Sequence, residues 1–372
     1  MLSTLVFIII SNNHEFRWYQ LYSGQSNYVI SDIIEAKDGN FIVIGTKMHG
    51  SSAAKIWLMK VNTDGHPLWN KSLSNSPAEG HSIAECSDGG FIIAGEFFNE
   101  SLWRWQILLL RISEDGTVLW SKNLLNKIQD ERPYDILRSS DGGFAITGSR
   151  DKDSYYRDCL VTKIDSFGNK LWDYSFGGYS TDVAYSIVET AVEEFVVAGR
   201  TRFLSGKGNT NMYLAKLNAS GLIWEKAFGG SLYTKAYDLL KTSDGGLVLV
   251  GCSRESYEDD NHFTVVRVDN EGETKWSKVY DYKGIGFCII QPNDENLVIV
   301  GETRSMQRIL VLKTDMNGSV VAHQQYGREE YTERVTSIIQ ASTEDLIMVG
   351  YSEIGGDWEP RIVEAWFHKI II

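Results

Sequence analysis

Residues that commonly perform catalysis or bind metals are scattered along this chain without a shared spacing. The seven histidines occupy no common position of a repeat, and neither H-x-x-x-H nor H-E-x-x-H occurs, so no zinc site is predicted. No G-x-S-x-G elbow is present, and the acidic clusters 151–153 and 258–260 lack the ligand spacing of a calcium loop. The sequence therefore predicts no metal and no cofactor, and any catalytic residue stays unknown.

The cysteines do not suggest metal or disulfide chemistry either. Cys86, Cys159, Cys252 and Cys288 form no C-x-x-C pair, and a chain of 372 residues can bury a large core without disulfide bonds. We expect buried free thiols, with a disulfide framework as the alternative.

Aromatic and arginine side chains make up the clearest candidate surface, because such residues dominate binding interfaces. They gather in variable segments that include 97–105, 150–156, 202–204, 254–257 and 356–358. The alternative is that they are ordinary loop residues whose rings pack on neighbouring loops. The candidate ligand-binding residues are Trp103, Trp105, Arg150, Tyr155, Tyr156, Arg202, Phe203, Arg254, Tyr257, Arg304 and Trp358.

The elements that position these residues belong to a unit of about fifty residues, which is written seven times. Its clearest part is an apolar strand such as Phe41–Gly45, preceded by a tight turn such as Asp38-Gly39-Asn40. Glycine accepts the positive φ that this kind of hairpin requires. The apolar strands close on Gly45, Gly95, Gly148, Gly199, Gly251, Gly301 and Gly350.

Each unit predicts four antiparallel strands. The fourth carries a tryptophan such as Trp69 or Trp120 in most units, with Ala322 in the equivalent place of the sixth. A four-stranded sheet is too small to bury both faces alone, and strand periodicity excludes a helical solenoid. We predict an all-β fold, a seven-bladed β-propeller of four-stranded antiparallel blades. The two tight turns of each blade should lie on one face of the ring, and the variable segments and interblade connections on the other.

The two ends of the chain indicate how the ring closes. The last unit stops at Ile372 before its fourth strand, and Trp18 stands in register with Trp69 without a unit before it. The N-terminal strand should therefore complete the C-terminal blade and remove its exposed edge. We expect residues 12–372 to form a single domain. Residues 1–11 contain an apolar run that fits a short signal or anchor segment, with an additional strand as the alternative.

One basic residue recurs near the end of each third strand. Regular spacing of this kind could line a channel for an anionic ligand, but the third strand of a propeller blade lies away from the axis. We expect these side chains to lay their stems across a neighbouring blade, with their charges at its surface. The residues are Lys60, Arg111, Lys163, Lys216, Arg267, Lys313 and Lys369.

The fourth-strand tryptophans belong to a phrase in which an acidic residue and a glycine precede the tryptophan, as in 62–69, 113–120 and 269–276. This pattern resembles the tryptophan docking motif of quinoprotein-like propellers and, more loosely, the Asp box of sialidases. In those families it joins blades, so the resemblance implies architecture. The whole repeat, with its D-G-G-F-x-x-x-G hairpin, resembles secreted or surface propeller-repeat proteins of bacteria and archaea. No cofactor or catalytic residue is carried over, because quinoprotein rings have eight blades and no sialidase arginine triad can be assigned.

The charge balance limits the partners. A net charge of −13 and a pI near 5.1 exclude a general nucleic-acid binder, and the apolar run 2–10 is too short to span a membrane. We expect a monomer at the cell surface or outside the cell, with a cytoplasmic location as the alternative.

The function predicted from these observations is a non-enzymatic binding module that recognises a protein or a surface glycan through its variable segments. A carbohydrate-active hydrolase or lyase with a site at the channel mouth is the alternative, and intracellular scaffolding is a third reading. An enzyme should place unusual acids on the innermost strands of one or two blades. The residues there vary too evenly to name a pair: Glu35, Glu85, Arg138, Glu189, Lys241, Gln291 and Gln340.

Overall fold

The computed structural model describes residues 18–22, 26–48, 54–73, 77–153, 155–205, 209–230, 232–304, 307–354, 362–370 and 372. The segment 1–11, for which a signal, an anchor or a strand was expected, lies outside these residues. The described chain is built from β-strands and one short 3-10 helix, η1 (Phe203–Ser205), which confirms the all-β prediction. None of its helices has the length and apolarity needed to cross a membrane.

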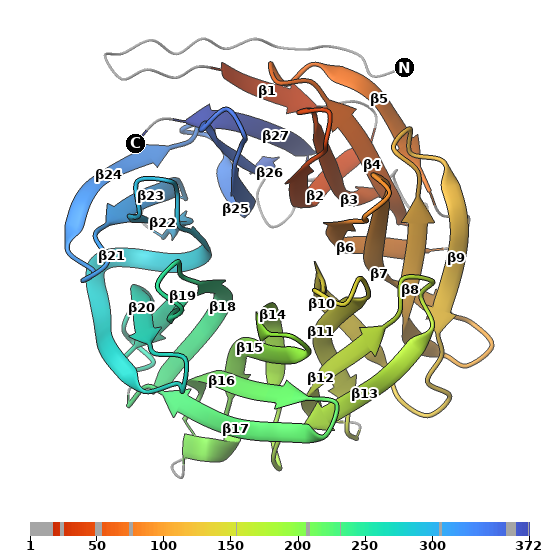
Figure 1. Cartoon of the computed structure of the whole chain (residues 1–372). Coiled ribbons are helices and arrows are strands. Elements are labelled where there is room, and N and C mark those ends of the chain that lie inside the picture. The colour runs from red at the N-terminus through yellow and green to blue at the C-terminus, as the bar shows by residue number, and fades with distance from the viewer. Residues whose placement is uncertain are drawn as a thin grey trace.

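Antiparallel sheets follow one another around a ring, as Figure 1 shows. The first sheet comprises β2 (Asn27–Glu35), β3 (Phe41–Met48), β4 (Lys55–Val61) and β5 (Pro67–Ser72). The second comprises β6 (Ala78–Glu85), β7 (Phe91–Asn99), β8 (Arg104–Ile112) and β9 (Val118–Leu124). The third comprises β10 (Glu131–Arg138), β11 (Phe144–Asp151), β12 (Arg157–Ile164) and β13 (Lys170–Phe176). The fourth comprises β14 (Val183–Ala191), β15 (Glu194–Thr201), β16 (Asn211–Asn218) and β17 (Gly221–Phe228).

The next sheet has seven strands, because one long strand serves two neighbours. It comprises β18 (Tyr233–Lys241), β19 (Leu247–Arg254), β20 (His262–Val268), β21 (Thr274–Ile290), β22 (Leu297–Thr303), β23 (Ile309–Thr314) and β24 (Val320–Tyr326). Residues 274–283 of β21 pair with β20, and residues 284–290 pair with β22. The chain thus passes from the outer edge of one group of strands to the inner edge of the next without leaving the extended conformation.

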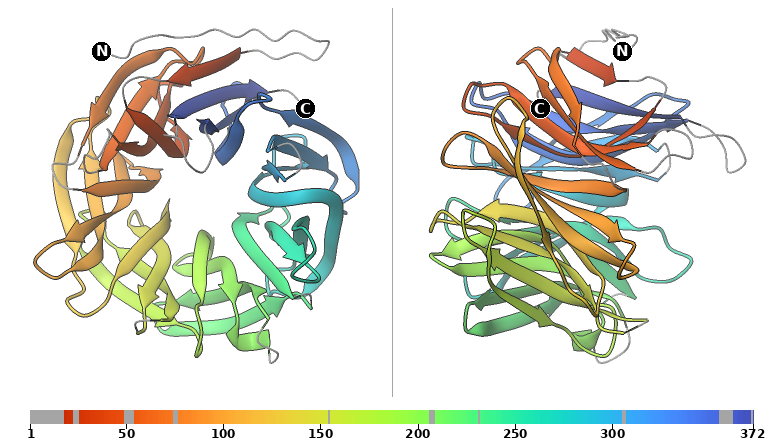
Figure 2. Two further views of the ribbon diagram at one scale, coloured as in Figure 1. Left: turned by 180° about the vertical axis from the view of Figure 1, so that it is seen from behind. Right: turned by 90° about the vertical axis from the view of Figure 1, so that its right-hand side faces the viewer.

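The N-terminal strand closes the ring, as the sequence predicts. The last sheet has the order β1 (Trp18–Tyr22), β27 (Ile362–Ile370), β26 (Leu346–Ile354) and β25 (Thr332–Gln340). Trp18 pairs with Lys369 and Tyr22 with Ala365, so β1 covers the outer edge of β27. Figure 2 shows from the side how the strands run between the two faces of the ring.

The core lies between neighbouring sheets. One cluster joins Ile42 and Ile44 of β3 to Ile93 of β7 and Leu110 of β8, and these side chains are buried. Second and third strands read as continuous apolar runs because each has a neighbouring sheet on both sides. All four cysteines are free and buried, as expected.

The basic residues of the third strands lie elsewhere than predicted. Each pairs with the acidic residue of the tight turn in its own sheet, whereas we had expected stems across a neighbouring blade and charges at its surface. Lys163 is completely buried, and its Nζ lies 2.7 Å from Asp141 Oδ2. A buried ammonium or guanidinium group requires a close carboxylate, and the turn provides one. The pairs are Lys60–Asp38, Arg111–Asp88, Lys163–Asp141, Lys216–Glu194, Arg267–Asp244, Lys313–Asp294 and Lys369–Asp345.

The fourth-strand tryptophans join neighbouring sheets. The ring of Trp69 lies over Gly116, in a turn of the next sheet, where an added Cβ would stand 2.7 Å from the indole. Trp120 contacts Gly168 in the same way. Glycine is needed at Gly116 both for this close approach and for its φ of 77°.

Candidate functional site

The inner strand segments of the described chain surround the ring axis: β2, β6, β10, β14, β18, the second half of β21, and β25 (Figure 1). In each, the pairing with the second strand skips one residue at the same place. Such a bulge redirects a side chain. The skipped residues are Ser31, His81, Tyr134, Tyr185, Tyr237, Phe287 and Thr336.

The closing glycines of the repeat are required by these bulges. A Cβ added to Gly251 would lie 1.8 Å from the backbone oxygen of Lys235, and one added to Gly45 would lie 2.0 Å from that of Val29. No side chain fits at such a distance, so glycine opposite the bulge lets the inner strand approach. The repeated glycine therefore helps to shape the inner surface of the ring.

A polar girdle next to the bulges links the inner strands to one another. Asp32 accepts hydrogen bonds from Ser82 Oγ at 2.9 Å and from Ser337 Oγ at 3.0 Å. Asp135 Oδ1 lies 3.1 Å from the same Ser82 Oγ. The girdle consists of Asp32, Ser82, Asp135, Ser186, Asp238 and Ser337.

Burial in the girdle raises the pKa of its carboxyl groups. Burial, followed by repulsion from Asp32, raises the pKa of Asp135 to about 7, and burial raises that of Asp238 to about 6. Since the Ser82 hydroxyl has one proton for two carboxyl groups, a proton on Asp135 satisfies both contacts. The raised pKa favours a proton on Asp135 near neutral pH, and the carboxyl groups of the girdle connect inner strands.

An aromatic arc, defined as His81, Tyr134, Tyr185, Tyr237 and Phe287, follows the bulges around the axis. Its ring centroids lie 6.3, 5.1, 5.7 and 4.7 Å apart in that order. The three tyrosines of the arc are half-buried. The arc offers polarisable ring surface with hydroxyl groups, which suits a peptide or a sugar ring.

Positive charge lies beside Tyr185 and Tyr237 of this arc. Lys235 Nζ lies 4.4 Å from the ring centroid of Tyr185 and 4.0 Å from that of Tyr237. Burial and the positive charge of Arg200 lower the pKa of Lys235 to about 8. Among the described residues, no carboxylate pairs with Lys235 or Arg200, and Arg200 Nε is buried without a hydrogen bond. We call Arg200 and Lys235 the basic corner.

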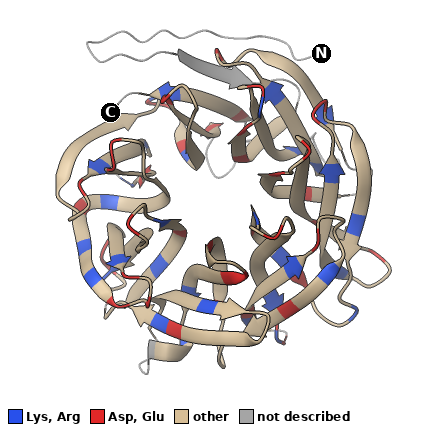
Figure 3. Ribbon diagram, viewed as in Figure 1, with Lys and Arg blue, Asp and Glu red and all other residues tan. Residues whose placement is uncertain are grey.

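The His81 end of the arc is acidic. Glu79, His81 and Glu96, which we call the acidic corner, lie together beside Arg132. Burial raises the pKa of Glu96 to about 7 although Arg132 opposes the change, and burial lowers the pKa of His81 to about 4 with Arg132 adding to the effect. Both signs of charge therefore occur around the axis, and Figure 3 shows basic and acidic residues interspersed around the ring.

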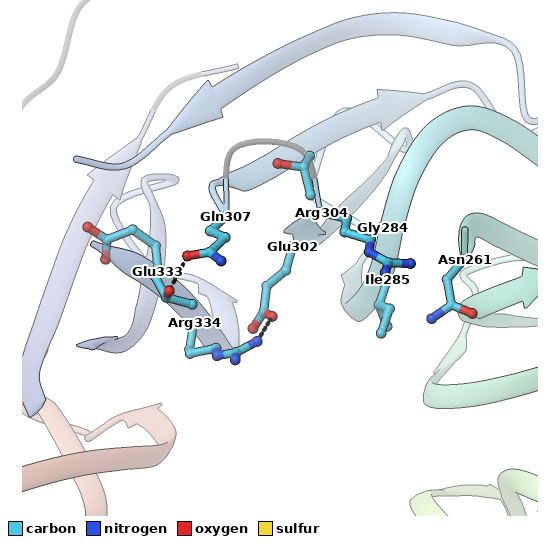
Figure 4. A pocket seen from close by; sticks show the side chains of 10 residues that line it. Asn261, Gly284, Ile285, Glu302, Arg304, Gln307, Glu333 and Arg334 are labelled. Atoms are coloured by element: carbon cyan, nitrogen blue, oxygen red, sulfur yellow. Dashed lines mark hydrogen bonds and ion pairs between the residues drawn. The ribbon is translucent and has the colours of Figure 1, made fainter. Parts of the chain in front are cut away.

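A pocket of about 220 Å³ lies between β22 and β25 (Figure 4). Arg334 Nη1 contacts Glu302 Oε2 at 2.6 Å within it, and Arg304 and Gln307 line it from the connection between β22 and β23. Asn261 closes the opposite side. The pocket brings paired charges and amide groups to the side of the ring that holds the variable segments.

The structure places Trp103 and Trp105 together. Phe98 lies 5.5 Å from each indole, and Trp103 is 74% exposed. Trp105 is half-buried, with the guanidinium of Arg132 at 5.1 Å from its ring. Trp103 thus projects into solvent, and Trp105 connects this loop to the acidic corner.

Two arginines of the predicted set have different surroundings. Arg150 is an internal connector, because its Nη2 contacts Glu131 Oε1 at 2.7 Å and also Asp173. Arg254 lies 5.2 Å from the ring of Tyr233, whose hydroxyl contacts Arg200, and 5.7 Å from that of Tyr257. Arg254 and Tyr257 therefore extend the basic corner outward.

The remaining predicted residues are distributed over several connections. Tyr155 is 85% exposed, Arg202 and Tyr156 are exposed, and the ring of Phe203 packs against Gly178. Arg304 pairs with Asp260 at 2.5 Å and lines the pocket. Trp358 lies outside the described residues. A role for this set in ligand binding stays a prediction.

Sequence reasoning missed the arc and both corners. The available signal was the pair of an aromatic residue and an Asp or Ser inside an inner strand, as in Tyr134-Asp135, Tyr185-Ser186 and Tyr237-Asp238. Strict alternation would put these neighbours on opposite faces of the sheet, but a bulge brings both toward the axis. The closing glycine opposite each pair was the second signal.

Comparisons with known proteins identify the fold. No protein-family model matches the chain, and no curated protein matches it. Many solved structures do. YCF48 bound to D1 peptide is 11% identical, with a TM-score of 0.54 and 94% of each chain covered. Chaetomium thermophilum Sqt1 bound to the N-terminus of ribosomal protein L10 is 10% identical, with a TM-score of 0.54 over 95% of this chain and 98% of that one.

A third structure names the architecture directly. The β-propeller domain of the Trilobed protease from Pyrococcus furiosus is 12% identical, with a TM-score of 0.54, covering 94% of this chain and 97% of that one. At such low identity the likeness concerns the fold alone. With the ring of antiparallel sheets described above, it shows that this chain is a β-propeller.

Proposed function

We propose that this protein is a non-enzymatic binding module, and that its ligand is a peptide segment of a protein partner that reaches the ring axis from the side of the variable segments. The basic corner is the observation that carries the proposal. Lys235 and Arg200 stand close enough to repel one another, next to the rings of Tyr185 and Tyr237, without a carboxylate partner among the described residues.

An acidic side chain or a chain terminus would complete this corner. A carboxylate placed between Lys235 and Arg200 would relieve their repulsion and form charge-assisted hydrogen bonds. The tyrosine rings beside them would cover apolar atoms of the same ligand. The chain as a whole carries a net charge of −13, so this local positive site would give an acidic ligand a preferred place to bind.

Two of the similar structures support a peptide ligand. YCF48 is bound to a peptide, and Sqt1 is bound to the N-terminus of another protein. Propellers host many functions, so the argument for this chain rests on the arc and the basic corner. Asp32, Asp135 and Asp238 lend no support to the carbohydrate-active alternative, because they accept hydrogen bonds that join inner strands.

We also infer that the ring has seven blades. β21 is long enough to serve as the outer strand of one blade and the inner strand of the next. Its change of partner falls between residues 283 and 284, and Gly284 has a φ of 158° there. Divided at that point, the seven-stranded sheet supplies two blades with the same strand order as the other sheets.

A peptide-display selection against the purified chain tests the function. The selected peptides should be acidic, and Lys235→Gln with Arg200→Gln should weaken their binding at least tenfold by fluorescence anisotropy. Lys278→Gln is a matched control, because this lysine also lies over an aromatic ring, Trp276, but on an outer strand. Equal affinity in the double variant, or ligands found only on a parallel glycan array, would overturn the proposal.

A further inference from the structure

Three side chains with metal-ligand chemistry meet in the acidic corner. Ligand atoms of Glu79, His81 and Glu96 all lie within 4.8 Å of one another. The fold brings them together in two ways. Glu79 of β6 is paired directly with Glu96 of β7, and the bulge skips His81 between Gly80 and Ser82.

Two atoms of this group are buried without a hydrogen-bond partner. Glu96 Oε2 and His81 Nε2 are 3.8 Å apart, too far for a hydrogen bond, and the Glu96 side chain is 4% exposed. Leaving a buried acceptor unpaired is costly. Arg132 Nη1 approaches the other oxygen, Oε1, at 3.3 Å and leaves Oε2 directed at the imidazole.

The register also places like charges opposite one another. Two glutamates directly across an antiparallel pair repel, and among the described residues Arg132 forms an ion pair with Glu96 whereas Glu79 has none. The group is therefore deficient in positive charge and holds two unused ligand atoms. A cation between the three side chains would correct both deficiencies at once.

We propose that Glu79, His81 and Glu96 bind a divalent transition-metal ion such as Zn²⁺, which accepts imidazole and carboxylate ligands. Zn²⁺ binds such ligands at about 2.0–2.2 Å, so each ligand atom would move by roughly 1 Å through rotation of its side chain. Three protein ligands leave the fourth tetrahedral position for water or a group from a ligand. The inference is independent of the proposed peptide ligand.

The linear sequence conceals this site. His81 and Glu79 are separated from Glu96 by a complete hairpin turn, so no short motif records the set. The spacing rules that predict no zinc site apply to ligands on one helix or one loop.

Calorimetric titration of chelator-treated protein with Zn²⁺ tests the inference. The wild-type chain should bind one equivalent, and Co²⁺ in its place should give the visible absorption of a site of low coordination number. His81→Phe keeps a ring at this position, as Phe287 does in another blade, and Glu96→Gln keeps an acceptor for Arg132. Both variants should bind Zn²⁺ at least tenfold more weakly.

His323→Ala is the matched control, because His323 is exposed on an outer strand and contacts the ring of Tyr282. It should bind Zn²⁺ as the wild type does. Absence of stoichiometric binding, unchanged affinity in Glu96→Gln, or loss of binding in the His323 control would overturn the proposal. Melting curves in chelator show which variants are folded. If His81→Phe does not fold, the Zn²⁺ affinity of Glu96→Gln decides the test.

Discussion

The two faces of the ring are built from different kinds of contact. On the tight-turn face, where the connections between first and second strands lie, one arrangement recurs from sheet to sheet: a buried base on the third strand pairs with the acid of the turn. Lys163 and Asp141 are an example, at 2.7 Å. On the variable-loop face, which carries the candidate residues, each contact differs. Lys152 Nζ donates to Gly178 O, whereas Arg304 pairs with Asp260.

The tight-turn face also joins sheet to sheet in a regular way. At the end of an inner strand, a Glu or Gln side chain accepts a hydrogen bond from the backbone of the turn in the preceding sheet. Four of the seven residues that vary evenly in the sequence have this connecting role. The pairs are Glu35 with Ser342, Glu189 with Ser140, Gln291 with Ser243, and Gln340 with Asn293.

This difference teaches how a repeated chain separates stability from recognition. Because repeated contacts hold one face together, loops on the other face can change residue by residue without loss of the ring. The exposed Trp103, Tyr155 and Tyr257 are all on the variable-loop face.

The largest effect should come from removing the strand on which both faces depend. Deletion of residues 12–24 removes β1 and exposes the edge of β27, so we expect the melting temperature to fall by on the order of 10 °C. Differential scanning calorimetry measures the change. Since Trp18 pairs with Lys369, appending residues 14–24 through a short turn after Ile372 should restore most of the loss. An unchanged melting temperature in the deletion would show that closure contributes nothing.

Asp141→Asn should damage the tight-turn face next most. The substitution removes the carboxylate partner of Lys163, whose side chain is 0% exposed, and breaking such a buried pair costs about 3 kcal/mol. Denaturant unfolding gives the free energy. Asp64→Asn is the control, because Asp64 lies in an exposed turn and forms no ion pair among the described residues. A similar small loss in both variants would contradict a structural role for the buried pairs.

The girdle predicts a pH dependence that the outer loops do not. The pKa of Asp135 is raised to about 7, so its protonated form is favoured on folding and stability is lost as the pH rises through that value. The free energy of unfolding should increase by about 1 kcal/mol for this group between pH 8 and 6.5.

Asp135→Asn should flatten part of this slope, measured by urea unfolding at the two pH values. Glu96, whose pKa is also raised to about 7, should keep the remainder. Below pH 6.5 His81 and His368 should oppose this gain, because their pKa values are lowered to about 4 and about 3 and the unfolded chain binds protons more readily there. The increase in stability should therefore be smaller than the carboxyl groups alone would give. Stability that rises steadily from pH 6.5 to 8 would contradict this assignment.

The smallest effect on stability separates two neighbouring tryptophans. Trp103→Ala removes a side chain that is 74% exposed, so the melting temperature should hardly change while ligand affinity falls. Trp105→Ala removes contacts with Phe98 and Arg132 and should cost about 1 kcal/mol. Thermal melts and binding to the selected peptide distinguish the two. Equal destabilisation would mean that Trp103 is part of the packing.

Much of the fold could be predicted from the repeat. Asp-Gly turns, apolar second strands and the unpaired Trp18 segment indicate the sheets and the closing strand. The continuity of β21 could not be predicted, because Gly284, where its two halves meet, is as compatible with a turn as with an extended strand. The ion pair of Lys60 with Asp38 could not be predicted either, because the two residues are 22 positions apart and come together only when the strands pair.

Less of the candidate site could be predicted. Loop aromatics such as Trp103 can be recognised in the sequence. Arg150 stands in a similar loop segment, but its guanidinium forms ion pairs with Glu131 and Asp173 inside the protein. Lys235 and Arg200 come from different sheets, and nothing in the linear spacing relates them. The residues of the arc lie at bulges of the inner strands, and the feature of the sequence that indicates each bulge is a glycine on the paired second strand.

The most direct test compares the two faces with one ligand. We would measure the affinity of a selected acidic peptide for the wild type, for Lys235→Gln with Arg200→Gln, and for Asp244→Asn, which breaks the pair of Asp244 with Arg267 on the tight-turn face. The double variant should bind at least tenfold more weakly at an unchanged melting temperature, and Asp244→Asn should lose stability but keep its affinity. The reverse pattern, with binding lost in Asp244→Asn and retained in the double variant, would contradict recognition at the axis on the variable-loop face.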